Sequence, residues 1–323
     1  MGPLTRRALL AALAVAPLAL AGCAAPQASR LRSAIESGAD RPRGLPARAA
    51  IAGVPFFAQR EYECGPAALA MAMQPAGVRV LPDTLVPEVW VPARQGSLQP
   101  EMLAAPRRRG LLSVRLGASL EDPLRALAGG LPVVVFQNLG LDAAPFWHYA
   151  VLIGYDLQRG TVVLHTGVEE ASEQSIHPFE RTWVRGGSWA MTVSHPDRLP
   201  DGAGEEAAAR GVAGLERVDP AAARQGWTAV LARWPGNRTA ALGLGNAAWA
   251  AGDKAGARAA WQAAVRRHPD FADAWNNLAH ALADAGERRA AIEAARRAVS
   301  LGGPRVQAYR ETLDGLSVEG LPD

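Results

Sequence analysis

Residues 59–73 read QREYECGPAALAMAM, and this stretch decides how the first half of the chain is interpreted. It passes from charged and polar residues into small apolar residues that favour a helix. Pro66 is tolerated in the first turn of a helix, and Gly77 marks its predicted end. Cys64 therefore lies at a predicted helix N-terminus, where unpaired N–H groups and the helix dipole favour the reactive thiolate.

Gln59 lies five residues before Cys64. A loop of this length can fold the Gln59 carboxamide back beside the sulfur. Together with the backbone N–H of Cys64, the carboxamide would supply two donors for a developing oxyanion. A buried free cysteine is the other interpretation of Cys64 taken alone.

The other cysteine, Cys23, ends an apparent targeting segment. A positively charged start is followed by an apolar run too short for an ordinary membrane helix, which ends in Leu-Ala-Gly-Cys at 20–23. This ending resembles a bacterial lipobox and predicts a signal peptide over 1–22 and a diacylglycerol on Cys23. A plain secretory signal is the alternative. Ala24 after the cysteine indicates the outer membrane, with the protein facing the periplasm.

A lipid on Cys23 would leave Cys64 without a disulfide partner in an exported protein, where cysteines normally pair. A single free thiol in an oxidising compartment is exposed to oxidation unless it is buried or used. The cysteine count therefore favours a catalytic role for Cys64.

Composition narrows the classes of function. The chain has 323 residues, 49% hydrophobic and 20% charged, with a net charge of +3, which suits two folded domains. The densest basic cluster, Arg107–Arg109, is interpreted as a solvated helix end, and we predict no nucleic-acid binding. Neither metal-ligand spacing nor a phosphate or dinucleotide loop is present, so we expect no cofactor.

The expected order of elements in residues 51–197 is helices first and then mostly antiparallel strands, which indicates an α+β fold. Residues 23–50, rich in Ala, Arg, Pro and Ser, are predicted to be a lipid-anchored flexible linker with one short helix over 28–37. Helices are expected at 64–77, 100–110 and 119–130, and strands at 54–59, 131–139, 148–156, 161–167 and 188–194.

The last third of the chain repeats itself. Several residues recur 34 positions later: Trp227 and Trp261, Pro235 and Pro269, Gly252 and Gly286, Ala257 and Ala291, Ala264 and Ala298. This period resembles the tetratricopeptide repeat, in which small residues let paired helices pack closely. An Ala-rich helical bundle is the alternative.

We predict a linker over 198–218, an all-α repeat domain over 219–316 and a tail over 317–323. The repeat domain would hold a half-repeat, two full repeats at 237–303 and a capping helix. The tryptophans of this region are interpreted as core residues, and the repeats as a surface for a protein partner.

His148 is the best candidate for the base that accepts the Cys64 proton. It begins a strongly apolar strand, HYAVLIGY, which would fix its position at the end of a sheet strand. His165 lies on the following predicted strand and could neighbour His148. The other histidines precede prolines or belong to the repeat region.

The order Gln-x4-Cys-Gly-Pro followed by His-Tyr on a strand resembles the papain-like cysteine peptidases that remove double-glycine leaders from bacteriocin precursors. The resemblance covers about residues 51–195. It implies a papain-like fold, with Cys64 as nucleophile, His148 as general base and then acid, and Gln59 as oxyanion donor. Cleavage after glycine pairs rests on the resemblance alone.

One position departs from the family pattern, in which an Asp-Pro pair on the next strand holds the imidazole. By motif the Asp position falls near Thr166, with Gly167 in place of the proline. By hairpin geometry His148 would instead lie opposite Glu169. Asp156, on the strand of His148, is too distant. The third catalytic residue, which would hold the His148 imidazole, is therefore Thr166, Glu169 or absent.

These features favour a membrane-anchored cysteine peptidase whose repeats recruit a protein substrate or partner. A second hypothesis is a docking lipoprotein that binds a peptide without cutting it. A third is an amidase acting on peptidoglycan, although Glu63-Cys64-Gly65 lacks the usual signature of that class.

Overall fold

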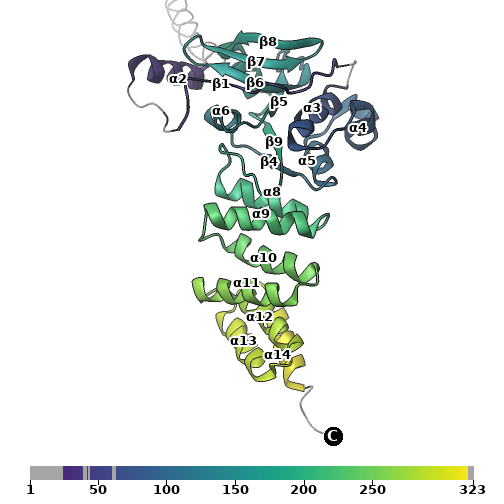
Figure 1. Ribbon diagram of the computed structural model, residues 1–323, viewed down its shortest axis with the longest axis vertical. Coiled ribbons are helices and arrows are strands. Elements are labelled where there is room, and N and C mark those ends of the chain that lie inside the picture. The colour runs from purple at the N-terminus through teal and green to yellow at the C-terminus, as the bar shows by residue number, and fades with distance from the viewer. Residues whose placement is uncertain (1–24, 39–41, 43, 60–62, 319–323) are drawn as a thin grey trace, which may run out of the picture. The chain divides into compact units, whose positions relative to one another are not determined.

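The computed structural model describes residues 25–38, 42, 44–59 and 63–318 (Figure 1). The predicted signal peptide and Cys23 lie outside these residues. The chain divides into two compact units. The described part of the first unit comprises residues up to 75, 79–98 and 116–192, and the second comprises 76–78, 99–115 and the chain from 193 onward. None of the described helices is both long enough and apolar enough to traverse a bilayer.

An antiparallel sheet is the centre of the first unit. Its strands follow the order β9-β5-β6-β7-β8, and β1 pairs with the end of β6. β4 adjoins β9, and the division between the two units runs through β9. The bounds are β1 Arg48–Ala50, β4 Leu112–Arg115, β5 Val133–Asn138, β6 Trp147–Asp156, β7 Thr161–Thr166, β8 Glu169–Ser175 and β9 Ala190–Ser194.

The apolar runs predicted as strands 131–139, 148–156, 161–167 and 188–194 are confirmed as β5, β6, β7 and β9. β5 and β6 are buried on both faces, which explains why they are apolar without alternation. β8, with the polar sequence EEASEQS, is an exposed strand that sequence reasoning missed. The strand predicted at 54–59 is absent, although Gln59 N–H donates to the Gly167 carbonyl.

Helix α3 (Cys64–Met73) is the central helix of the first unit. Every residue from Gly65 to Met73 is buried, because small and apolar side chains cover all its faces. Further elements of this unit are α2 (Pro26–Ser37), α4 (Pro82–Val89), α6 (Glu121–Ala128), α7 (Ile176–Arg185) and the small hairpin β2 (Trp90–Val91) with β3 (Gly96–Ser97).

The short helix predicted over 28–37 is confirmed as α2, but the prediction that it belongs to a flexible linker over 23–50 is wrong, because α2 is packed against the domain. Ala28 and Leu31 are buried, and α2 lies against α7. The buried Glu180 carboxylate of α7 accepts the backbone N–H groups of Gln27 at 3.0 Å and Ala28 at 2.7 Å. A carboxylate at a helix N-terminus satisfies its unpaired donors and fixes α2 in place.

The predicted linker over 198–218 is also wrong, because Glu205–Glu216 form helix α8 in the second unit. α8 packs on β4 and on α5 (Gln99–Arg107). A Cβ at Gly211 would lie 2.9 Å from a Val114 methyl, so only glycine allows this approach. The Gly/Ala/Glu composition that suggests a linker instead permits close helix packing.

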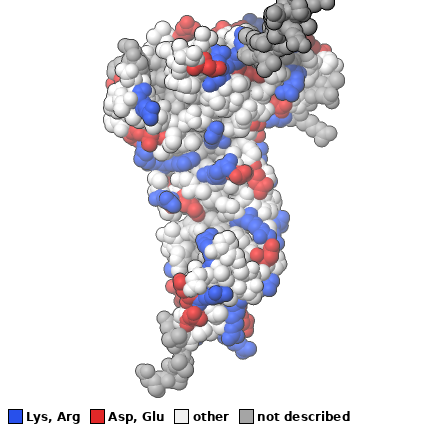
Figure 2. All heavy atoms as spheres, turned by 180° about the vertical axis from the view of Figure 1, so that it is seen from behind, with Lys and Arg blue, Asp and Glu red and all other residues white. Residues whose placement is uncertain are grey.

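The repeat prediction is confirmed in the rest of the second unit. Antiparallel helix pairs follow one another, with Trp227 against Gly243 and Trp261 against Gly245 in the core. On the face seen in Figure 2, Lys and Arg side chains intermingle with Asp and Glu along these helices. The helices are α9 (Pro220–Arg233), α10 (Arg238–Ala250), α11 (Lys254–Arg267), α12 (Ala272–Asp284), α13 (Arg288–Leu301) and α14 (Val306–Val318).

Candidate active site

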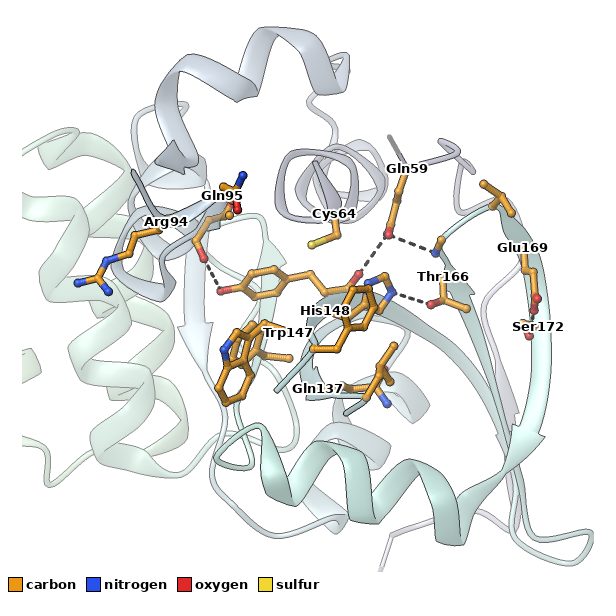
Figure 3. A pocket seen from close by; sticks show the side chains of 18 of the residues that line it. Gln59, Cys64, Arg94, Gln95, Gln137, Trp147, His148, Thr166, Glu169 and Ser172 are labelled. Carbon is orange, nitrogen blue, oxygen red and sulfur yellow. Dashed lines mark hydrogen bonds between the residues drawn. The ribbon is translucent and has the colours of Figure 1, made fainter. Parts of the chain in front are cut away.

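A cleft of about 1010 Å³ lies within the first unit, where α3 begins beside the start of β6. It brings together Cys64, His148 and Gln59, the three residues that the sequence selects for chemistry. Figure 3 shows Cys64 in the middle of the cleft, with Gln59, His148 and Thr166 on one side and Arg94 and Trp147 on the other.

Cys64 is the first residue of α3, and its side chain is partly exposed. Burial raises the pKa of the Cys64 thiol above its ordinary value of 9.0. Backbone hydrogen bonds from Tyr149, Gly65 and Cys64 itself lower the pKa, but by less than burial raises it. The expected thiolate at the helix N-terminus is therefore not the form that this environment favours.

His148 lies opposite Gln137 of β5 and is 9% exposed. Its Nε2 atom lies 2.8 Å from the Thr166 hydroxyl oxygen. Burial lowers the pKa of His148 from 6.5 to about 4, so the ring is neutral near pH 7. With Nε2 donating to Thr166, the neutral ring presents Nδ1 as the acceptor for a proton.

A bulge in the β6–β7 pairing decides which residue reaches His148. The register changes by one residue between Leu152 and Gly154, so simple hairpin counting does not hold beyond it. Thr166, at the motif position, contacts the ring. Glu169 belongs to β8 and accepts a hydrogen bond from Ser172 at 2.5 Å.

Gln59 ties the ends of two strands together. Its Nε2 group donates to the Tyr149 carbonyl at 3.1 Å, and its Oε1 accepts from Gly167 N–H at 3.1 Å. Since Gly167 N–H needs an acceptor, the network fixes which end of the carboxamide faces which strand. One of the two Nε2 hydrogens serves Tyr149, and the second is available to another acceptor.

His165, the other buried histidine of these strands, is held by backbone groups. Its Nε2 atom lies 3.2 Å from the Val54 carbonyl, and its Nδ1 accepts from Ala171 N–H at 3.1 Å. Both ring nitrogens are therefore used to join β7 and β8 to the segment that leads to Gln59. His165 is a structural histidine in this arrangement.

The roles of three cleft residues escaped the sequence analysis. Tyr149 joins the site through its backbone, which hydrogen-bonds both Cys64 and Gln59. Trp147 stacks on Phe136 with ring centroids 5.3 Å apart. Arg94 comes from the turn between β2 and β3, far from any motif. Only the position of Tyr149 and Trp147 beside His148 could have drawn attention to them.

Within this cleft, burial favours the neutral thiol of Cys64 and the neutral imidazole of His148. Among the described residues no hydrogen bond joins the Cys64 sulfur to the His148 ring. Such contacts often tighten only when substrate binds. Within the same residues no group of His, Cys, Asp and Glu could hold a metal ion.

A cysteine at a helix N-terminus beside a histidine at the start of a sheet strand is the arrangement of papain-like cysteine peptidases. Residues 51–193 match the family described as the Peptidase_C39 like family. Residues 209–261 and 242–305 match the tetratricopeptide repeat. The chain is thus a C39-like domain followed by an all-helical repeat region.

Similar solved structures cover one part of the chain each. A protein described as a C39-like peptidase from Bacillus anthracis is 21% identical, with a TM-score of 0.40 over 47% of this chain and 98% of that one. The translocator chaperone SycD of Yersinia enterocolitica is 16% identical, with a TM-score of 0.33 over 35% and 83%. MamA is 24% identical, with a TM-score of 0.33 over 36% and 67%. No curated protein matches the chain.

Proposed function

We propose that the chain is a cysteine peptidase in which Cys64 is the nucleophile and His148 the general base and acid. The observation that carries this proposal is the single cleft that holds both residues together with Gln59 and Thr166. A C39-like domain makes a peptide substrate the natural class.

The reaction follows from the protonation states of the two residues. His148 Nδ1 takes the thiol proton as Cys64 sulfur attacks a peptide carbonyl, because the pKa directions favour a neutral pair over a thiolate–imidazolium pair. The imidazolium then gives its proton to the leaving amine, and the C–N bond breaks. Water, deprotonated by His148, releases the acid and restores the thiol.

The tetrahedral intermediate needs donors for its oxyanion. The second Nε2 hydrogen of Gln59 and the backbone N–H of Cys64 fit this role, since both groups belong to the cleft. The Thr166 hydroxyl would hold the ring of His148, as the Asp of the family pattern does. A hydroxyl carries no charge, so it gives the imidazolium less stabilisation than a carboxylate.

The raised pKa of Cys64 and the lowered pKa of His148 also support a second candidate function, a domain that binds peptides without cutting them. A thiol with a raised pKa is a weaker nucleophile at neutral pH, and a base with a pKa of about 4 is a weak base. In this case the cleft would hold a peptide tail while the repeats recruit a partner.

The repeats would recruit a protein substrate or partner and raise its concentration at the cleft. A diacylglycerol on Cys23 would anchor the protein at the outer membrane, facing the periplasm. The support for this anchor is the Leu-Ala-Gly-Cys ending at 20–23. Metabolic labelling with an alkyne fatty acid tests it, because Cys23→Ser would lose the label and Cys64→Ser would keep it.

Peptide cleavage is tested on a complex mixture of peptides, with new termini identified by mass spectrometry. The wild-type chain is expected to create new termini, and Cys64→Ala to create none while it still binds peptides. The same cleavages by Cys64→Ala would overturn the proposal. Binding by both proteins without cleavage by either would favour the docking function.

A further inference from the structure

Helix α2 joins the proposed lipid attachment site to the first unit over a short length of chain. Gln27, whose backbone N–H is bound by the Glu180 carboxylate, lies four positions after Cys23. A chain spans at most about 3.6 Å per residue, so Gln27 lies within about 14 Å of the Cys23 Cα atom. A flexible linker over 23–50 would instead reach about 30 Å on average and up to about 95 Å.

The first turn of α2 is held by two other helices of the first unit. The Glu180 carboxylate of α7, which is 1% exposed, accepts the N–H groups of Gln27 and Ala28. The Gln27 side-chain oxygen accepts the backbone N–H of Leu120, the residue before α6, at 2.7 Å. The buried side chains of Ala28 and Leu31 add apolar contact. While these contacts persist, α2 is part of the domain and cannot act as a stalk.

The same two helices carry cations without an acidic partner. Arg30 is exposed on α2, and Arg181 is partly exposed on α7. Neither forms an ion pair within the part of the chain that the structure describes. His177, one turn before Arg181, places its Nε2 atom 3.3 Å from the Ser29 hydroxyl oxygen, so this side of α7 faces the start of α2. Guanidinium groups beside a bilayer are attracted to its anionic headgroups.

The length of chain before α2 decides what can cover this end of the unit. A single helix with its side chains is about 10–12 Å in diameter, so a span of at most about 14 Å leaves no room for a folded partner between the lipid and α2. The exposed residues of α2 include Ser29, Arg30 and Ser33, which are polar. Polar residues suit contact with lipid headgroups and oppose insertion into the hydrocarbon.

We propose that α2 holds the first unit directly on the bilayer, with the ends of α2 and α7 against the lipid headgroups. This inference rests on the proposed lipid at Cys23 and specifies what that anchor does. A domain of this size is about 40 Å across, which limits the height of the cleft above the membrane. The cleft therefore acts on peptide segments held at or near the same bilayer surface.

Energy transfer to labelled lipids tests the proposal on the lipidated chain in vesicles of phosphatidylethanolamine and phosphatidylglycerol. A donor dye is placed on α2 by Ser33→Cys in a Cys64→Ala background, and acceptor dyes are placed on lipid headgroups. Transfer should be high, and it should fall when about 20 Gly and Ser residues, which reach about 25 Å, are inserted after Ala24. This insertion leaves the folded unit intact. Low transfer without the insertion would overturn the proposal.

Hydrogen exchange on the same vesicles distinguishes a docked helix from a stalk. The N–H groups of Gln27 and Ala28 should exchange slowly, and Glu180→Ala should accelerate their exchange about 10–100-fold, because hydrogen bonds to a buried carboxylate are lost. Glu173→Ala, which removes an exposed carboxylate paired with Arg159 on another part of the unit, is the matched control and should change neither rate. Unprotected exchange in α2 of the lipidated chain would overturn the proposal.

The outcomes for the anchor and for the peptidase are distinct. A chain that takes up no fatty-acid label and binds no vesicles lacks the lipid, which would overturn this inference and leave cleavage of soluble peptides unaffected. High transfer with protected α2 but without any peptide cleavage would reject the peptidase function and support the position of the first unit on the bilayer.

Discussion

In the repeats, the ion pair between Arg224 and Asp253 recurs one repeat later between Arg258 and Glu287. In the cleft, by contrast, the Gln59 side chain accepts a hydrogen bond from Gly167 N–H, 108 residues away in the sequence. Each repeat contacts its neighbours in sequence, so the same contact appears at the same spacing. The cleft is assembled by strand register and by a helix end, and no contact in it recurs.

This difference separates what supports the fold from what supports chemistry. A repeat can lose one contact and keep its neighbours, because the same packing is present in the next repeat. The described lining of the cleft includes the Cys64 sulfur, the His148 imidazole and the Gln59 carboxamide, which lies between two strand ends. Substitutions should therefore act on activity in the first unit and on local stability in the second.

The largest expected effect is that of His148→Ala, which removes the proposed base. We expect kcat/KM to fall by about 10³-fold or more with little loss of folded protein. His165→Ala is the matched control, since it removes a buried histidine of the neighbouring strand that joins backbone groups. It should lower stability by about 1–3 kcal/mol and retain activity per folded molecule. The reverse outcome would exchange the roles of the two histidines.

The next effect concerns the repeats. Trp261→Ala should destabilise the repeat helices by about 3–5 kcal/mol, because a large buried ring is lost against Gly245. Hydrogen exchange should accelerate in α10–α12, while cleavage of a short peptide stays unchanged. An equal acceleration of hydrogen exchange in α3 and β6 would contradict the expectation that a substitution in the repeats acts only on the local stability of the second unit.

A smaller effect is expected at Thr166. Thr166→Val should lower kcat/KM about tenfold, since the hydrogen bond that orients His148 is lost, and Thr166→Ser should restore most of it. In the wild-type chain kcat/KM should rise through about pH 4, where His148 becomes neutral, and persist beyond neutral pH because the thiol pKa is raised.

Thr166→Asp should move that acid limb to higher pH. A carboxylate beside the imidazolium raises the pKa of His148, so the neutral base is populated only at a higher pH. The measurement is the pH profile of kcat/KM for the two proteins. An unchanged acid limb would mean that position 166 does not act through His148.

The smallest effect is expected at the repeated ion pair. Arg258→Ala should cost less than about 1 kcal/mol, because both partners are partly exposed and solvent screens them. Arg224→Ala, its equivalent one repeat earlier, should cost a similar amount. Urea unfolding monitored on the repeat helices checks both. A loss above about 2 kcal/mol for one of them alone would mean that the two repeats are not equivalent.

The sequence predicts the repeats and the central strands well because the signal is local. A period in Trp, Gly and Ala specifies helix pairs, and apolar runs specify buried strands. The same local analysis misses α8, whose Gly211 serves close packing rather than flexibility. It also misses the docking of α2, which depends on a single buried carboxylate, Glu180, distant in sequence.

Within the cleft, motif order selects Cys64, His148 and Gln59, and the structure brings them to one cavity. The choice between Thr166 and Glu169 depends on a bulge that no local pattern reveals. The protonation states depend on burial, which outweighs the helix N-terminus at Cys64. The degree of burial of a side chain depends on the whole fold, so its effect on the pKa cannot be predicted from the residues adjacent in sequence.

The central claim, that Cys64 attacks a carbonyl with the help of His148, is tested most directly by trapping the acyl-enzyme. The chain is mixed with an activated peptide ester, quenched in acid within one turnover and measured by intact-mass and peptide-level mass spectrometry. We predict one acyl group on Cys64 in the wild-type chain, formed far more slowly in His148→Ala. Acylation of Cys64 at equal rates in wild type, His148→Ala and denatured protein would contradict the claim.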